Sequence, residues 1–193
     1  CQKEGDFVTL ENDLHKLIDK ALALGASGAK TVEVAKIKTG AWTRWKCQFG
    51  CPNYGKTLCC PPFVPGYEET QKFLREFAQG IIVQYKFTLE KIDSTDFAAA
   101  DLSMSNGLLD ILLTLEREAF LQNHYKAFAL KAGRCRLCDQ CNLTKCVHPT
   151  KARPSLEACG IDVMALANDN GYSAEILQGP VQELKIYGLL LVE

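Results

Sequence analysis

Four cysteines within twelve residues constrain this chain more than any other feature of its sequence. Cys135, Cys138 and Cys141 are separated by two residues each, and Cys146 follows after four more. Three thiolates at this spacing, followed closely by a fourth, let the backbone wind around one inorganic cluster, as ferredoxin-type loops do. The usual bacterial run has three residues before its last cysteine and a proline directly after it, whereas here Pro149 comes two residues late. The spacing predicts a [4Fe-4S] cluster held by these four thiolates.

Zinc and disulfide bonds are the alternatives for this run. A tetrahedral zinc ion usually takes its thiolates from two separated Cys-x2-Cys or Cys-x4-Cys arms, so three ligands within seven residues crowd a single ion. Disulfides suit small secreted domains, whereas a chain of 193 residues can bury a substantial core without them. The ten cysteines therefore need a reason other than stability, and we favour iron-sulfur while zinc and paired or free thiols stay open.

A second group of cysteines lies nearer the N-terminus. Its members are Cys47, Cys51, Cys59 and Cys60. Glycines and prolines stand between and after them, which predicts a loop shaped around a ligand, although a free cysteine is also an ordinary small core residue. Neighbouring side chains diverge, so Cys59 and Cys60 do not easily reach the same small cluster. One of the two is therefore a candidate for a free thiol, a ligand of a different cluster or a nucleophile.

Basic and aromatic side chains surround this second group. Cations near an anionic cluster raise its reduction potential, and aromatic rings limit the access of water, but both kinds of residue are also ordinary on surfaces and in cores. The cations are Arg44, Lys46 and Lys56, and the aromatic residues are Trp42, Trp45, Phe49, Tyr54 and Phe63.

The composition limits the classes of partner. The chain carries 22 basic and 23 acidic residues, a formal net charge of -1, which argues against a general binder of nucleic acid. No apolar run approaches the roughly 18 to 20 residues that cross a bilayer, and no signal-peptide hydrophobic region begins the chain. We therefore expect a cytoplasmic protein without a membrane span. Mature lipidated proteins also begin with cysteine, but we interpret Cys1 as a processing end and leave it out of the site.

Hydrophobic periodicity predicts alternating helices and strands. Helices are expected over 9–24, 67–78 and 108–123, with a short one between Asp162 and Gly171. Strands are expected over 31–38, 81–88, 126–131 and 181–192, and a loop over 91–104. This order predicts an α/β fold in which helices cover a mixed β-sheet, forming a single domain over 1–193. The two cysteine-rich metal-cluster loops would be inserted between these elements and meet on one side of the sheet.

Three segments resemble a known family. They are the run from Arg44 to Pro62, the run from Gly133 to Cys141, and the run from Arg153 to Asp162. They are similar to a family of cysteine-rich bacterial and archaeal proteins predicted to bind metal, of the domain of unknown function 2284 type, and the resemblance covers most of the chain. It implies a metal-binding signature made of Cys47, Cys51, Cys59, Cys60, Cys135, Cys138, Cys141, Cys146 and Cys159. It implies no settled reaction.

These observations lead to one functional hypothesis and two alternatives. We expect an iron-sulfur redox protein with one or two [4Fe-4S] clusters, working in electron transfer or as the redox module of an anaerobic system, with a redox partner protein or a small-molecule substrate. The first alternative is an enzyme with an open-coordination cluster near Cys59 and Cys60. The second is a zinc-stabilised interaction module without redox chemistry. His148 and Cys159 follow the main run, and a supporting or incidental role is the expectation from their positions alone.

Overall fold

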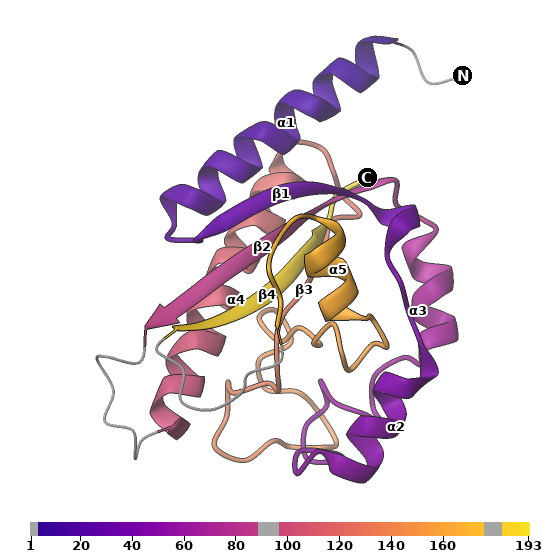
Figure 1. The fold of residues 1–193 in the computed structure, drawn as a ribbon. Coiled ribbons are helices and arrows are strands. Elements are labelled where there is room, and N and C mark those ends of the chain that lie inside the picture. Colours follow the sequence, from indigo (N-terminus) through magenta and orange to yellow (C-terminus); the bar gives the residue numbers. More distant parts are fainter. Residues whose placement is uncertain (1–3, 89–96, 176–182) are drawn as a thin grey trace.

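A four-stranded antiparallel sheet with helices on both faces forms the body of the chain (Figure 1). The computed structural model describes residues 4–88, 97–175 and 183–193. In chain order the elements are α1 (Glu4–Ala23), β1 (Gly28–Glu33), the 3-10 helix η1 (Val34–Lys36), α2 (Ala41–Gly50), α3 (Tyr67–Leu74), β2 (Gln79–Thr88), α4 (Phe97–Leu121), β3 (Phe128–Leu130), α5 (Val163–Asp169) and β4 (Glu183–Leu191). The sequence-based expectation of an α/β fold with a helix-covered sheet is confirmed, but the sheet is antiparallel throughout and not mixed.

The strand order is β1-β2-β4-β3, so the two longest strands lie at the centre of the sheet. β2 and β4 pair from Gly80 opposite Leu191 to Thr88 opposite Glu183. Both centre strands are apolar where β2 begins and β4 ends, because Ile81, Ile82 and the residues opposite them are fully buried, whereas Lys86 pairs with Lys185 toward the other end. A strand that is buried on both faces needs apolar side chains in both directions, and this explains the continuous apolar runs of the sequence.

Helices α1 and α4 cover one face of the sheet. Their apolar stripes pack on β2 and β4 in one cluster that contains Leu14, Leu17, Ala21, Leu108, Ile111, Leu112, Leu115, Ala119, Ile81, Val83 and Leu190. Gly188 allows the close approach of α4, because a Cβ at this position would lie 2.6 Å from Leu112 Cδ1. The stripes expected from the 3.6-residue period are therefore the ones that form this core.

The opposite face carries α5, the end of α3 and the turn around residues 155–161. Their apolar side chains form a second cluster with the sheet, which includes Leu74, Phe77, Leu156, Cys159, Ile161, Leu166, Ile82, Leu189 and Leu191. Asp162 begins α5 as expected, since its Oδ1 accepts a hydrogen bond from Ala165 N at 2.9 Å. This face adjoins the end of the molecule where the cysteine segments lie.

Most predicted elements are confirmed, and two predictions are wrong in part. The strand expected at 31–38 begins earlier, at Gly28, and gives way to η1 at Val34. Within the loop expected at 91–104, residues 89–96 lie outside the described residues, and α4 already begins at Phe97. Three consecutive alanines favour this extension, because alanine is the best helix former. Among the helices in the described parts of the chain, none is both long and apolar enough to cross a bilayer.

The loop expected across the N-terminal cysteine group is also wrong in its first part, where α2 forms. No proline interrupts residues 41–50, and Cys51 is extended, with φ of -94° and ψ of 122°. The residue before a proline disfavours helical geometry, so Pro52 sets the end of α2. Cys47 is therefore a helical residue, and Cys51 begins the loop.

Candidate metal centre

The two cysteine segments lie at the same end of the molecule (Figure 1). They meet there and share a small cavity. Five thiols line it, and we call them the five-thiol cluster: Cys59, Cys135, Cys138, Cys141 and Cys146. The cavity holds about 20 Å³, and Thr57, Leu137, Asn142 and His148 complete much of its wall. The expectation that the two cysteine loops meet is therefore confirmed, and Cys59 joins the thiols of the C-terminal loop.

Local turns, without any helix or strand, shape the C-terminal cysteine loop from 132 to 154. Gly133 has φ of +61°, a left-handed conformation that glycine adopts at low cost, and it turns the chain into the loop. Asn142 Oδ1 accepts hydrogen bonds from the backbone N-H groups of Thr144 and Lys145, at 2.9 and 3.3 Å. This turn brings Cys146 back toward Cys141.

A buried lysine fixes the entry to this loop. Lys131 is 1% exposed, and its ammonium donates to the carbonyl oxygens of Ala132, Gly133 and Arg134 at 2.7, 3.0 and 2.7 Å. It also donates to Ser105 Oγ of α4 at 3.0 Å. Burial lowers the pKa of Lys131, and the nearby thiols of Cys135, Cys59 and Cys60 oppose that shift. The lysine therefore clamps the backbone and places a cation beside the thiols.

The protonation of two neighbouring thiols is strongly shifted. Hydrogen bonding from Cys59 lowers the pKa of Cys135 to about 6, against the effect of burial and with help from the Leu137 N-H and the Lys131 charge. The same hydrogen bond, together with burial, raises the pKa of Cys59. The opposite directions of the two pKa shifts make Cys135 the more acidic thiol of the pair and Cys59 the less acidic one. Thiolates are the form that binds metal.

The remaining cysteines of the N-terminal segment, Cys47, Cys51 and Cys60, form what we call the three-thiol group. It adjoins the five-thiol cluster, because the charges of both Cys51 and Cys135 act on the Cys60 thiol. The Cys51 N-H donates to the Cys47 carbonyl at 3.2 Å, one helical turn back, and Gly55 N donates to Pro61 O at 2.8 Å, which folds the loop closed. Burial raises the pKa of Cys47, and the nearby charges of Cys51 and Cys60 raise it further. Adjacent Cys59 and Cys60 therefore diverge into different groups, as neighbouring side chains tend to do.

Cys159 lies apart from both groups, in the apolar cluster under α5. It is 5% exposed, and burial raises the pKa of its thiol to about 11. The guanidinium of Arg44 stands near it and donates to Ala158 O at 3.1 Å, which ties α2 to this turn. A ligand role for Cys159 stays a prediction from the family resemblance.

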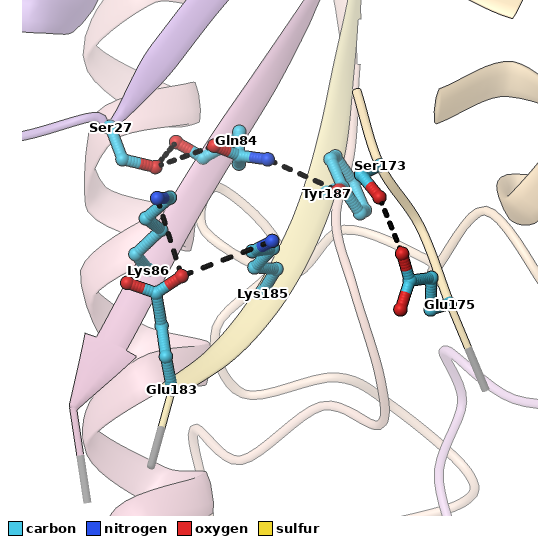
Figure 2. Close-up of polar contacts among 8 residues, drawn as sticks. All are labelled: Ser27, Gln84, Lys86, Ser173, Glu175, Glu183, Lys185 and Tyr187. Atoms are coloured by element: carbon cyan, nitrogen blue, oxygen red, sulfur yellow. Dashed lines mark hydrogen bonds and ion pairs between the residues drawn. The ribbon is translucent and has the colours of Figure 1, made fainter. Parts of the chain in front are cut away.

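A much larger cavity, of about 1050 Å³, adjoins the three-thiol group. Cys47 and Cys51 line it together with the aromatic face of α2, residues of α5 and β4, and Glu157. Figure 2 shows the polar side chains along the β4 side, where the Glu183 carboxylate stands 3.2 Å from Lys86 Nζ and 3.9 Å from Lys185 Nζ. Gln84 Nε2 donates to Tyr187 Oη at 3.1 Å. The aromatic residues Trp42, Trp45 and Phe49 are 47%, 65% and 73% exposed, so they belong to the cavity and not to the core.

All nine described cysteines are free thiols, so none of them is paired in a disulfide bond. Within residues 4–88, 97–175 and 183–193, no three cysteine, histidine, aspartate or glutamate side chains lie close enough together to hold one metal ion as they stand. The thiols are gathered by the fold, and a shell around a bound group would require them to draw in further.

Sequence reasoning missed two residues of this region. The sequence placed Lys131 only at the end of a short strand. Its role at the entry to the loop depends on a β-bridge to Ser155, which no local sequence pattern predicts. Glu157 also went unnoticed, although it lines the large cavity and its Oε2 is buried without a hydrogen-bond partner. A charged residue two positions before Cys159, within a resembling segment, was the only signal for it.

Comparison with known proteins gives one match. The family model described as "Predicted metal-binding protein (DUF2284)" matches residues 30–192. That range contains both thiol groups, Lys131 and Cys159. It also contains all four strands apart from the first two residues of β1. No curated protein and no solved structure matches the chain.

Proposed function

The chain belongs to the DUF2284 family of predicted metal-binding proteins, and on that premise we propose that it is an iron-sulfur redox protein whose [4Fe-4S] cluster sits in the five-thiol cluster. The observation that carries the proposal is the convergence of five free thiols from two distant segments on one cavity. Cys135, Cys138, Cys141 and Cys146 are the proposed ligands. When bound, such a cluster supplies one-electron transfer.

The residues around the thiols fit a thiolate-bound anionic group. Soft thiolate ligands select zinc, copper(I) or iron-sulfur clusters, and three thiols within seven residues suit a cluster better than one tetrahedral zinc ion. Lys131 contributes a positive charge beside Cys135 and Cys59. Cys59 donates a hydrogen bond to the Cys135 sulfur, and hydrogen bonds to a ligating sulfur raise the reduction potential. Zinc remains the competing metal.

The loop also offers a surface for a redox partner protein. Leu143 and Val147 are 43% and 61% exposed, and both belong to the same short loop as the proposed ligands. Exposed apolar side chains beside a redox centre suit the small, transient interfaces of electron-transfer complexes. Free thiols and an oxygen-sensitive centre fit a reducing compartment such as the cytoplasm.

Anaerobic purification followed by iron, zinc and acid-labile sulfide assays tests the proposal. We expect a brown protein with iron and sulfide, and an electron paramagnetic resonance signal after reduction. Cys138→Ser and Cys141→Ser should each lose most of the cluster of this site, whereas Cys60→Ser, outside the five-thiol cluster, should keep it. A colourless protein with stoichiometric zinc and no sulfide would refute the proposal.

The divergence of Cys59 and Cys60 favours a second candidate function. Three thiolates from Cys47, Cys51 and Cys60 would leave one iron of a second cluster open to a substrate, and Cys47 and Cys51 line the large cavity where a substrate could sit. We propose this open centre as the basis of an enzymatic function. Cys60→Ser should then remove about half of the iron while the signal of the five-thiol cluster persists. Equal iron content in Cys60→Ser and the unaltered protein would eliminate the second centre.

A further inference from the structure

We infer that the large cavity beside the three-thiol group binds a neutral, planar aromatic molecule that carries a hydroxyl or amino hydrogen-bond donor. The inference concerns the ligand of the cavity formed by α2, α5 and β4, and it goes beyond the proposed redox function. It depends on the shape and chemistry of the cavity walls and not on which metal the thiols hold.

One wall is an aromatic face on α2. Trp42, Trp45 and Phe49 are spaced three and four residues apart, so they lie on the same side of the helix. The rings of Trp45 and Phe49 stack with centroids 5.7 Å apart and planes inclined by 29°. Large aromatic side chains that are exposed together mark binding surfaces, because leaving them in water loses the stabilisation that burial would give. Their stacked faces suit a flat ring.

A second part of the wall is apolar and comes from α5 and β4. Met164 is 38% exposed and lines the cavity with Val163, Leu184, Ile186 and Tyr187. A thioether makes favourable contacts with aromatic rings and adapts to their position. The cavity of about 1050 Å³ has the size of sites that bind small organic ligands. An aromatic ligand would therefore contact both the rings of α2 and the aliphatic groups of α5 and β4.

Glu157 supplies the polar anchor. Its side chain lines the cavity, and its Oε2 is shut off from solvent without a hydrogen-bond partner. A buried acceptor without a partner is costly, so native structures rarely keep one unless a ligand or water completes it. The carboxylate stands near Cys47 and Cys159, since its charge raises the pKa of both thiols. The Glu157 side chain lines the cavity, so a hydroxyl or amino group on the ligand would draw its carboxylate toward the cavity and donate to it there, beside the thiols.

The charges of the wall favour a neutral ligand. Glu183 is already flanked by Lys86 and Lys185, and Glu175 Oε1 accepts from Ser173 Oγ at 2.8 Å (Figure 2). Lys46, the other lysine of the wall, lies over the Trp42 ring, with its Nζ 5.2 Å from the ring centroid. Glu157 is the carboxylate of this wall whose buried oxygen lacks a partner. An anionic ligand placed there would meet the Glu157 carboxylate with like charge, which is unfavourable where water is excluded.

Equilibrium dialysis of the anaerobically purified protein with 2-naphthol and with naphthalene tests the inference. We expect one 2-naphthol per chain and about tenfold weaker binding of naphthalene, which lacks the donor. Phe49→Ala and Trp45→Ala should weaken 2-naphthol binding by about tenfold, because each removes part of the stacked wall. Phe120→Ala is the matched control: its ring is 60% exposed on α4, outside this cavity, and its loss should change nothing.

Glu157→Met separates the polar anchor from the aromatic wall. This variant should bind both probes equally, since the donor on 2-naphthol then has no acceptor. If circular dichroism shows that Glu157→Met does not fold, the Phe49→Ala and Trp45→Ala variants still decide the question. Their side chains are exposed, so removing them should not unfold the protein. Binding that is weak and nonstoichiometric, or that is unchanged by Phe49→Ala and Trp45→Ala, would overturn the inference. Iron and sulfide assays on the same samples keep the two proposals apart: iron-sulfur protein that does not bind 2-naphthol ends only this inference.

Discussion

Replacing Lys131 with methionine tests how the cysteine loop is held. Methionine keeps a similar length and volume but has neither charge nor donor, so the substitution removes only the polar part of the side chain. Four acceptors lose their partner: the carbonyl oxygens of residues 132, 133 and 134, and Ser105 Oγ. Because Lys131 is 1% exposed, water does not readily replace the ammonium.

The expected cost follows from two opposing terms. Ser105 Oγ is buried and the three carbonyl oxygens are partly buried, so each acceptor left without a donor costs about 1.5 kcal/mol and the four together roughly 6 kcal/mol. Burying an ammonium is itself unfavourable, as the lowered pKa of Lys131 indicates, and removing it returns about 3 kcal/mol. We therefore expect Lys131→Met to lower the free energy of unfolding by about 3 kcal/mol. The thiols of Cys135 and Cys59 also lose a neighbouring cation, so their pKa values should rise and metal content should fall.

Urea denaturation followed by circular dichroism measures this effect. With a slope of about 2 kcal/mol per molar urea, the midpoint should fall by roughly 1.5 M. Lys126→Met is the control, because Lys126 is an exposed lysine just before β3 and its removal should leave the midpoint unchanged. A shift below about 0.5 M for Lys131→Met, or an equal shift for Lys126→Met, would show that the clamp does not hold the loop.

Three further predictions concern the supports of the site. Arg153→Met leaves the half-buried carboxylate of Glu116 without its guanidinium partner, and we expect a loss of about 2 kcal/mol in urea denaturation. Tyr172→Phe removes a buried hydroxyl that has no hydrogen-bond partner, so stability at neutral pH should hold or rise. Burial raises the pKa of Tyr172 to about 12 from its ordinary 10.0, so the unfolded chain releases this proton first and stability should fall between pH 10 and 12. The variant should lack that part of the fall when midpoints are compared at both pH values. Gly160→Ala should cost about 2 kcal/mol or more, because φ is +89° and the new Cβ would lie 2.5 Å from the Cβ of the first residue of α3. Gly50→Ala, with open space around it, is the control and should cost nothing.

Local patterns predicted the parts of the fold that depend on one segment at a time. The stripe of Leu108, Leu112 and Leu115 shows a helical period, and the buried face of α4 follows from it directly. The alternation from Ile81 onward likewise predicted β2, and Asp162 predicted the start of α5. Strand order could not be obtained in this way, because β2 pairs with β4, about a hundred residues later, through backbone groups that every residue carries.

That the cysteines gather was predictable from their spacing, whereas their division between the two groups was not. Thiol spacing predicted two groups, and the divergence of Cys59 from Cys60 was foreseen from the geometry of neighbouring side chains. Which of the two would join the C-terminal loop depends on the closure of the N-terminal loop by Gly55 and Pro61, a single backbone hydrogen bond of 2.8 Å. The surroundings of the aromatic residues were also predicted wrongly, because they too depend on distant parts of the chain. Trp45 and Phe49 suggested a core or a dry wall within a loop, whereas they lie exposed on a helix beside a cavity that distant strands complete.

Backbone pairing explains why the two cysteine segments come together at all. The residues that lead into α2 pair with those that follow the C-terminal loop: Thr39 bridges Ile161, and Gly40 N donates to Gly160 O at 2.8 Å. The start of the C-terminal loop is fixed independently, because Lys131 bridges Ser155. Both ends of that loop, and the start of the N-terminal segment, are therefore tied to the sheet by hydrogen bonds that involve no cysteine. These hydrogen bonds bring the two cysteine segments together without any contribution from the thiols, so a bound metal would have only to order the short turns between these fixed points.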